Sequence, residues 1–315
     1  MTKMKAILCT RYGPPDVLRL SEVEKPVPGK NEVCIRIYAT AVTASDTIVR
    51  NFKIPRWHPV GFLMGMVLGF RKPRKPILGM VLAGEVESAG ENVKLFKTGD
   101  QVFAWTIKSA VEINFGTYAE YKCLAEDSVM ALKPDSTGFN EAAAIPYGGL
   151  IALHYLKKGN IRSGQNVLIY GASGAIGTSA VQLARSFGTD VTGVCSTANL
   201  ELVRSLGAEK VIDYTREDVL DSGEQFDLIL DAVGKWKSSE FKKQCNKALT
   251  PGGKYISVDD GSPKGTLENL LLLKELVETG KLKPVIDRTY PLEKMVEAHR
   301  YVDQGHKKGN VVITI

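Results

Sequence analysis

Hydrophobic and polar positions follow two different patterns along this chain. Up to about residue 125, short apolar runs rich in Val, Ile and aromatics (EVCIRIYATAV, VLAGEVESAG, GTYAEYKCL) are separated by GPP, KPVPGK, SAGENV and KTGD. Short β-type runs between Gly- and Pro-rich turns predict a compact antiparallel β domain.

From about residue 140 to 262, helical stretches alternate with the short apolar runs NVLIYGA, DVTGVCS, KVIDY, FDLILDAVG and GKYISVD. This alternation predicts a parallel sheet with crossover helices, hence an α/β protein. The tail adds two amphipathic helices, TLENLLLLKELVETG and PLEKMVEAHRYVDQG, and a last strand, NVVITI.

Composition limits the class of protein. The 315 residues are enough for two domains, and 44% hydrophobic with 24% charged residues are typical of a globular protein. The net charge of +6 favours anionic small ligands but falls short of the dense basic face of a nucleic-acid binder, so no nucleic-acid partner is expected.

The cysteines and the N-terminus predict a cytoplasmic location. Five dispersed cysteines without a C-x-x-C pair argue against a disulfide framework and against a structural zinc lobe. The first residues, MTKMKAILCTRYGPP, lack an apolar region of secretory length.

Residues 60–79, VGFLMGMVLGFRKPRKPILG, are apolar for eleven residues and then strongly basic. So short a run cannot span a bilayer, so no transmembrane segment is expected. Two interpretations remain: a loop or short helix that caps a substrate pocket, or an interfacial contact with a membrane.

A glycine-rich stretch, G-x-x-G-x-x-G, lies between the run NVLIY and a helix-patterned segment. Its first glycine permits a tight turn, the second lets the backbone approach a pyrophosphate, and the third lets the helix press on the sheet. The N–H groups at the helix start favour phosphate. The motif predicts a dinucleotide site made of Gly171, Ala172, Ser173, Gly174, Ala175, Ile176 and Gly177.

The end of the second strand favours NADPH over NADH. An NAD site places Asp or Glu about 20 residues after the glycines to bind the ribose 2′-hydroxyl. Here Ser196 and Thr197 occupy that point, and the first carboxylate is Glu201. Two hydroxyls can donate to a 2′-phosphate that no acid repels. Arg204 or Arg216 could add positive charge, or either could be an ordinary solvated residue.

Several motifs, in order, resemble the medium-chain dehydrogenase/reductase superfamily and, within it, the zinc-independent quinone oxidoreductase branch. They are GPPDVLRLSEVEKPVPGKNEVCIRI, GASGAIG, SLGAEKVIDY, DAVG and GKLKPVIDRTYPLEKMVEAH. The resemblance covers nearly the whole chain. It implies a GroES-like catalytic domain of residues 1–125 and 263–315, a Rossmann domain of residues 126–262 with a doubly wound parallel sheet, and a cofactor in the cleft between them.

The resemblance also allows a comparison with zinc alcohol dehydrogenases. Their Cys in C-x-S/T-D, their His in G-H-E and a further Cys or acid match Thr43, Met80 and, approximately, Tyr147 here. A hydroxyl, a thioether and a phenol do not make a Zn²⁺ site, so no metal is expected. Alcohol oxidation, which needs the metal to polarise the alcohol, is disfavoured.

With alcohol oxidation disfavoured, the remaining reaction is hydride delivery to an electron-poor acceptor. A quinone or an α,β-unsaturated carbonyl accepts hydride without a strong Lewis acid, because the charge is delocalised onto oxygen. The candidate catalytic hydroxyls are Thr43, Ser45 and Tyr147: by resemblance Ser45 matches a proton relay, and Tyr147 could donate a proton. Each could equally be a satisfied cleft hydroxyl. Asp46 is expected to fix its own turn.

Further cofactor contacts follow from the resemblance alone. Tyr214 matches a position near the adenosine half, and Asn310 matches a tail residue that reaches the cofactor. Residues after the fourth and fifth strands match the surroundings of the ribose and nicotinamide: Ala232, Val233, Gly234, Val258 and Asp259. One departure is Leu200, where quinone reductases often carry a Lys.

The stretch YISVDDGSPKGTLENLLLLKEL runs almost directly from the fifth strand into the tail helix. It leaves too few residues for the sixth strand that is usual in the family, so we expect five parallel strands. The common edge-to-edge dimer then lacks its edge, which leaves a monomer or a different homodimer.

The four histidines do not pair with Cys or acid at ligand spacing. His154 and His299 lie in helical patterns and are expected to be packing or surface residues, and His58 is a weak site candidate.

Two alternative functions stay open. An enoyl-thioester reductase would need a basic patch for a nucleotide-bearing carrier, which Arg71, Lys72, Arg74 and Lys75 could supply. A non-catalytic NADPH-binding sensor, or an RNA-associated protein, would keep the glycines without turnover.

Overall fold

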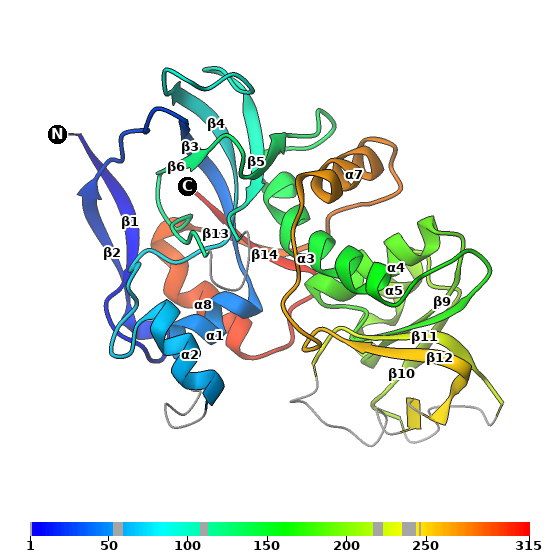
Figure 1. The fold of residues 1–315 in the computed structure, drawn as a ribbon. Coiled ribbons are helices and arrows are strands. Elements are labelled where there is room, and N and C mark those ends of the chain that lie inside the picture. Colours follow the sequence, from blue (N-terminus) through cyan, green and yellow to red (C-terminus); the bar gives the residue numbers. More distant parts are fainter. Residues whose placement is uncertain (1, 53–58, 108–112, 217–222, 235–243, 246) are drawn as a thin grey trace.

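The structure is a computed structural model that combines a mostly antiparallel sheet, a parallel sheet and a long helix between them (Figure 1). This confirms the predicted α/β class with a GroES-like and a Rossmann-type layer. The structure describes residues 2–52, 59–107, 113–216, 223–234, 244–245 and 247–315.

The antiparallel layer is built around its longest strand, β3. The first half of β3 pairs with β6, its second half pairs with β14, and β4 runs along its other edge. The strand order is β13-β14-β3-β4-β5-β7, with β1 and β2 forming a separate antiparallel pair. The strands are β1 (Lys3–Cys9), β2 (Leu18–Glu24), β3 (Glu32–Val42), β4 (Val81–Ala89), β5 (Gln101–Trp105), β6 (Tyr121–Ala125), β7 (Val129–Leu132), β13 (Ile286–Pro291) and β14 (Asn310–Thr314).

Two features of this layer bear on the expected domain division. β14 pairs with β3, so the C-terminal strand lies in the N-terminal sheet. β7 pairs with β5, so the sheet continues past residue 125, where the sequence pattern placed the end of the first domain.

The parallel layer has the order β10-β9-β8-β11-β12, and all four pairings are parallel. Five strands are therefore present in the described part of the chain, as predicted from the short segment after the fifth strand. The order reverses at β8, and this reversal opens a crevice at the carboxyl edge of such sheets. The strands are β8 (Asn166–Tyr170), β9 (Asp190–Cys195), β10 (Lys210–Asp213), β11 (Phe226–Asp231) and β12 (Leu249–Ser257).

The helices pack on these sheets or between them. Both helices predicted in the tail are present, as α7 and α8. The helices are α1 (Ala44–Asn51), α2 (Pro59–Leu68), α3 (Phe139–Lys158), α4 (Ala175–Ser186), α5 (Leu200–Ser205), α7 (Leu267–Glu278) and α8 (Met295–Asp303), with short turns η1 (Pro15–Val17), η2 (Thr197–Asn199) and η3 (Leu292–Lys294).

Helix α3 joins the two layers. It packs on β3, β4, β5 and β14 on one side and on α4 and α7 on the other, as its central place in Figure 1 shows. Fourteen of its residues are buried, which fits a helix that is apolar on all sides. One continuous core cluster runs through it from Val81 of β4 through Leu150 to Leu183 of α4.

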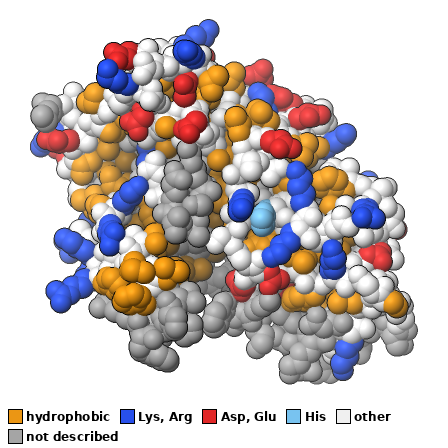
Figure 2. All heavy atoms as spheres, in the orientation of Figure 1, with side chains coloured by type: hydrophobic (Ala, Val, Ile, Leu, Met, Phe, Trp, Pro, Cys, Tyr) orange, Lys and Arg blue, Asp and Glu red, His pale blue; other side chains and the backbone are white. Residues whose placement is uncertain are grey.

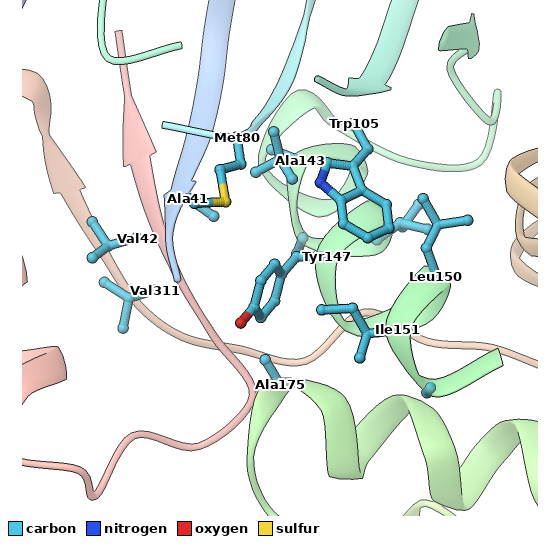
Figure 3. Packing of buried hydrophobic residues seen from close by; sticks show 14 of the residues in the cluster. Ala41, Val42, Met80, Trp105, Ala143, Tyr147, Leu150, Ile151, Ala175 and Val311 are labelled. Carbon is cyan, nitrogen blue, oxygen red and sulfur yellow. The ribbon is translucent and has the colours of Figure 1, made fainter. Parts of the chain in front are cut away.

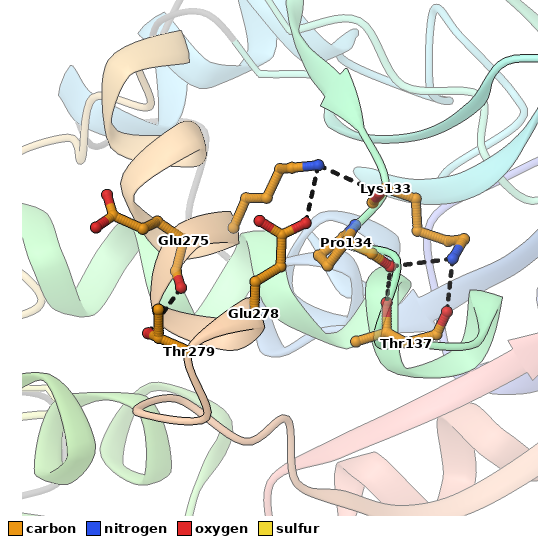
Figure 4. Close-up of polar contacts among 7 residues, drawn as sticks. Lys133, Pro134, Thr137, Glu275, Glu278 and Thr279 are labelled. Carbon is orange, nitrogen blue, oxygen red and sulfur yellow. Dashed lines mark hydrogen bonds and ion pairs between the residues drawn. The ribbon is translucent and has the colours of Figure 1, made fainter.

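The connection between β7 and α3 is fixed by α7 (Figure 4). The Lys133 ammonium donates to the carbonyls of Pro134 at 3.0 Å and Thr137 at 2.6 Å. From α7, the Lys274 ammonium donates to the Lys133 carbonyl at 3.4 Å and pairs with Glu278 at 3.1 Å. Helix α7 thus holds the start of α3 in place.

The contact between α3 and α4 leaves no room for a side chain at Gly148. A Cβ there would lie 2.2 Å from the Ala175 carbonyl oxygen. We expect Gly148→Ala to lower the free energy of unfolding by about 1 to 3 kcal/mol, because one helix must move away from the other. Chemical denaturation measures this change.

Gly138→Ala is the matched control, because a Cβ at this N-cap position of the same helix meets only Glu141 Oε2, at 3.9 Å. Equal losses in the two variants would show that the α3–α4 contact does not limit stability.

Candidate functional site

The residues predicted to bind a dinucleotide gather at the carboxyl edge of the parallel sheet. Residues 171–177 follow β8, Ser196 and Thr197 follow β9, and Tyr214 follows β10. Ala232, Val233 and Gly234 follow β11, and Val258 and Asp259 follow β12. Because all five strands are parallel, their carboxyl ends lie at one edge, on both sides of the reversal at β8.

The three glycines have separate physical roles. Gly171 has φ +80°, which favours glycine, and a Cβ at Gly177 would lie 2.1 Å from the Gly171 carbonyl oxygen. A Cβ at Gly174 would meet only that same oxygen, at an ordinary 3.7 Å. The fold therefore requires glycine at 171 and 177, whereas at Gly174 the space above the start of α4 is open to a ligand.

The turn after β9 carries both predicted hydroxyls, but they differ in hydrogen bonding. The Thr197 hydroxyl donates to the Asp213 carboxylate from β10. The Ser196 hydroxyl accepts from Asn199 Nδ2 at 3.1 Å, and this amide also donates to Ser173 at 3.2 Å. The Ser196 hydroxyl has no acceptor among the described residues, so its hydrogen is available to a ligand, whereas that of Thr197 is used within the protein.

The C-terminal segment brings a cation that the sequence pattern did not single out. Gly309 N–H donates to the Ser173 carbonyl at 2.8 Å, so the segment lies against the glycine loop. The Lys308 ammonium reaches the Ala198 carbonyl, at 3.4 Å, in the turn after β9. Only the pairing of β14 with the other sheet brings Lys308 here, which is why no local signal indicated it. Asn310 is buried and donates to the Val285 carbonyl at 3.1 Å.

The turn after β11 is held by a buried carboxylate. Asp231 accepts from the backbone N–H groups of Val233 at 3.0 Å and Gly234 at 3.1 Å. Gly234 has φ +95°, and a Cβ there would lie 2.6 Å from a carboxylate oxygen of Asp259. The turns after β11 and β12 are therefore in close contact.

Tyr214 and Val258 follow the two outer strands of this edge, β10 and β12. Tyr214 is 45% exposed, with its ring 6.3 Å from that of Tyr170. The Val258 carbonyl accepts from the Tyr155 hydroxyl at 2.7 Å, which ties the end of β12 to α3.

The candidate catalytic hydroxyls come together from two elements. Ser45 Oγ, on α1, lies 3.0 Å from the hydroxyl of Tyr147, on α3. Burial raises the pKa of Tyr147, although its hydrogen bonds with Ser45 and Thr43 act in the opposite direction. Tyr147 therefore keeps its proton at neutral pH and can act as a donor.

Thr43 is placed differently from these two. Its hydroxyl donates to Asp46 Oδ2 at 2.6 Å, and Asp46 N–H donates back to the hydroxyl at 3.2 Å. The pair caps α1, which confirms that Asp46 fixes its own turn. Thr43 can then accept, but not donate, a hydrogen bond toward the cleft.

The positions that match zinc ligands lie in an apolar environment. Figure 3 shows Met80 and Tyr147 in one cluster with Ala41, Ala143 and Trp105. Thioether and phenol groups packed in this way, with the Thr43 hydroxyl committed to Asp46, do not fit Zn²⁺, which prefers thiolate, imidazole or carboxylate.

A buried polar network joins the last turn of α1 to α8. The Arg50 guanidinium is fully buried; it lies 3.1 Å from His299 Nδ1 and pairs with Asp303 at 2.7 Å. Burial, with Arg50 beside it, lowers the pKa of His299 to about 3, so the imidazole is neutral and accepts from Arg50. His299 is a packing residue, as predicted, and His58 lies outside the described residues.

Parts of the chain match known families. Residues 29–135 match the family described as "Alcohol dehydrogenase GroES-like domain", and residues 175–281 match "Zinc-binding dehydrogenase". Residues 264–313 match a second family with the latter description. No helix in the described ranges is both long and apolar enough to cross a membrane.

Similar proteins include the 2-methylene-furan-3-one reductase of Solanum lycopersicum, 34% identical over 99% of this chain and 79% of the relative. The chloroplastic NADPH-dependent alkenal/one oxidoreductase of Arabidopsis thaliana is 32% identical over 99% of this chain and 79% of its own length. The solved quinone oxidoreductase from Coxiella burnetii is 27% identical with a TM-score of 0.85, and the match covers 100% of both chains. Since one relative is named chloroplastic, a cytoplasmic location for this chain stays a prediction.

The network under α1 predicts a pH dependence of stability. The pKa of His299 is about 3 in the folded protein and near its ordinary 6.5 in the unfolded chain. Below pH 6.5 the unfolded state binds the extra proton, so stability is lost as the pH falls toward 3, by about 1.4 kcal/mol per pH unit. His299→Asn, which keeps an acceptor for Arg50, should flatten this loss in denaturation series from pH 7 to 4.

The control is the exposed His306→Asn, which should follow the wild type. Burial raises the pKa of Asp46 to about 6, so this acid lowers stability as the pH rises from about 4 to 6, in the opposite sense. Slopes are therefore compared between variants, and equal slopes for His299→Asn and wild type would contradict the assignment.

Proposed function

Because the chain belongs to the medium-chain dehydrogenase/reductase superfamily, we propose that it is a zinc-independent, NADPH-dependent reductase of quinones or α,β-unsaturated carbonyls. The observation that carries this proposal is the contact of the Ser45 and Tyr147 hydroxyls where zinc relatives hold a metal ligand. The names of the tomato, Arabidopsis and Coxiella proteins support the substrate class.

The residues at the sheet edge fit a dinucleotide. The pyrophosphate would lie over Gly174 and the start of α4, where N–H groups are available. The ribose would lie beside the turns of Ala232–Gly234 and Val258–Asp259, and Tyr214 would flank the adenosine half. When bound, the nicotinamide supplies the hydride.

Two groups favour NADPH over NADH. Within the part of the chain that the structure describes, the Ser196 hydroxyl hydrogen has no acceptor, and Lys308 places an ammonium beside the same turn. Related quinone reductases often carry a Lys at the position of Leu200. In this chain Lys308 would supply that positive charge. Asp213, whose carboxylate accepts from Thr197 and Thr215, is occupied by these hydroxyls.

Proton delivery is assigned to Tyr147. Hydride addition to an enone or quinone leaves an enolate or phenolate that needs a proton. A buried phenol with a raised pKa holds its proton until such a base forms beside it, and Ser45 orients the phenol. The surrounding apolar cluster excludes water from the reaction.

Zinc takes no part in this proposal. Thr43, Met80 and Tyr147 supply no thiolate, imidazole or carboxylate at the matching positions, so polarisation of the acceptor relies on hydrogen bonds. Thr43 then serves to position α1 through Asp46, and Ser45 depends on that helix start.

The first test follows nicotinamide absorbance with chelator-treated protein, NADPH or NADH, and a panel of quinones, enones and enoyl thioesters. We expect turnover with NADPH and a quinone or enone. Tyr147→Phe should lower kcat about 100-fold, because a general acid is lost, with the Kd for NADPH unchanged. Tyr290→Phe, on β13, is the control.

Three outcomes would count against the proposal. Loss of turnover after chelator treatment would show that the reaction requires a bound metal ion. Turnover confined to enoyl thioesters would favour the thioester reductase. NADPH binding with no turnover on any acceptor would favour a non-catalytic sensor.

The second test concerns the cofactor. Lys308→Met should weaken NADPH about tenfold in fluorescence titrations and leave NADH unchanged, because only NADPH has the 2′-phosphate. Lys281→Met, exposed after α7, is the control. Equal losses of affinity for NADPH and NADH would show that Lys308 stabilises the loop and does not contact the 2′-phosphate.

A further inference from the structure

A cavity of about 480 Å³ lies in the first domain beside α1 and α2, among residues to which the proposed reaction assigns no role. Two loops complete its walls. It is lined by Val49, Val67, Leu68, Pro73, Arg74, Lys75, Ile113, Asn114 and Phe115.

One end of the cavity is apolar. Val49 of α1, Leu68 of α2 and Phe115 are each less than 10% exposed and belong to the main core cluster. Val67 packs against the same cluster. This end can bury an apolar chain or ring.

The wall formed by the end of α2 is fixed by hydrogen bonds. The Tyr12 hydroxyl is within donating distance of the carbonyls of Leu68, at 3.0 Å, and Gly69, at 2.8 Å. Arg74 N–H donates to the Leu68 carbonyl at 2.8 Å. The loop that carries Arg74 and Lys75 is thus tied to the helix that forms the apolar wall.

The other end of the cavity concentrates positive charge. The Lys75 ammonium donates to Asn114 Oδ1 at 3.3 Å and to the Ile113 carbonyl at 3.2 Å. The Lys122 ammonium donates to the same Asn114 oxygen at 3.2 Å and to the Phe115 carbonyl at 2.9 Å. Two ammonium groups therefore share one neutral amide oxygen, and Lys122 is only 9% exposed.

No carboxylate in the described ranges forms an ion pair with Lys75 or Lys122. Residues 71–75 contain four Lys and Arg and no Asp or Glu. Burial, together with the neighbouring Lys75, lowers the pKa of Lys122 to about 8, although Glu32 acts in the opposite direction. Like charges held this close in a low-dielectric site attract an anion.

We infer that this cavity binds an amphipathic anion, a carboxylate or phosphate on an apolar chain or ring. The anionic group lies at Lys75 and Asn114, with Arg74 beside it and Lys122 behind it. The apolar part lies against Val49, Leu68 and Phe115. Figure 2 shows Lys and Arg side chains beside the apolar surface over α2, which would also guide an anion toward this side of the molecule.

The inference concerns binding alone and does not depend on the proposed reductase activity. It connects to that activity through α1, because Val49 lies one helical turn after Ser45. A bound ligand would thus contact the helix that carries a candidate catalytic hydroxyl.

The test is calorimetric titration of the full chain, without NADPH or acceptor, with octanoate, octyl phosphate and the neutral 1-octanol. We expect at least one anion to bind at least tenfold more tightly than octanol. Lys75→Met should remove that preference while leaving octanol binding unchanged. Lys75 is exposed, so the variant is expected to fold.

Lys72→Met is the matched control, because Lys72 is an exposed cation of the same loop that does not line the cavity; it should change anion affinity less than twofold. Equal affinity for octanol and both anions, equal losses in the two variants, or no measurable binding would each overturn the inference. Preference for octyl phosphate over octanoate, or the reverse, identifies the anionic group.

Discussion

The close contact of α3 with α4 is the constraint on which the rest of the molecule depends. Gly148 lies against the Ala175 carbonyl with no room for a side chain. Ala175 opens α4 directly above the glycine loop, and Tyr147 precedes Gly148 on α3. One backbone contact therefore sets the distance between the candidate proton donor and the start of the helix that would bind a phosphate.

Several segments near this contact connect the two layers. Helix α3 packs on both, α7 holds the connection that leads into α3, and β14 carries the C-terminal segment into the sheet of β3. Just before β14, Gly309 N–H donates to the Ser173 carbonyl, so the same segment also lies against the glycine loop. The cofactor edge is thus assembled from distant parts of the chain, each fixed by packing in the opposite layer.

The first domain contains one buried cation that is paired with a carboxylate and two cations that contact only neutral oxygens. In the last turn of α1, the buried Arg50 side chain has one partner at each of its three nitrogens, the Gly13 carbonyl, His299 and Asp303, so it ties the end of the helix to α8 and to the N-terminal segment. Beside α2, Lys75 and Lys122 share only amide and carbonyl oxygens. Arg50 is compensated by the Asp303 carboxylate and is therefore structural. Lys75 and Lys122 would instead attract a counter-ion, because their charge lies beside a cavity without a paired carboxylate in the described ranges.

The sequence by itself determined the elements and the glycine loop. Strand and helix periods follow from which side chains must be buried, and the count of parallel strands follows from the number of residues after β12. The roles of Gly171 and Gly177 are local, because a turn and a close approach need only short-range geometry. Tertiary structure alone decided that Thr197 donates to Asp213 and that Lys308 reaches the turn after β9. It also decided that Lys75 and Lys122 meet at Asn114. These contacts join residues far apart in the chain, and only the packing of both layers fixes their distances.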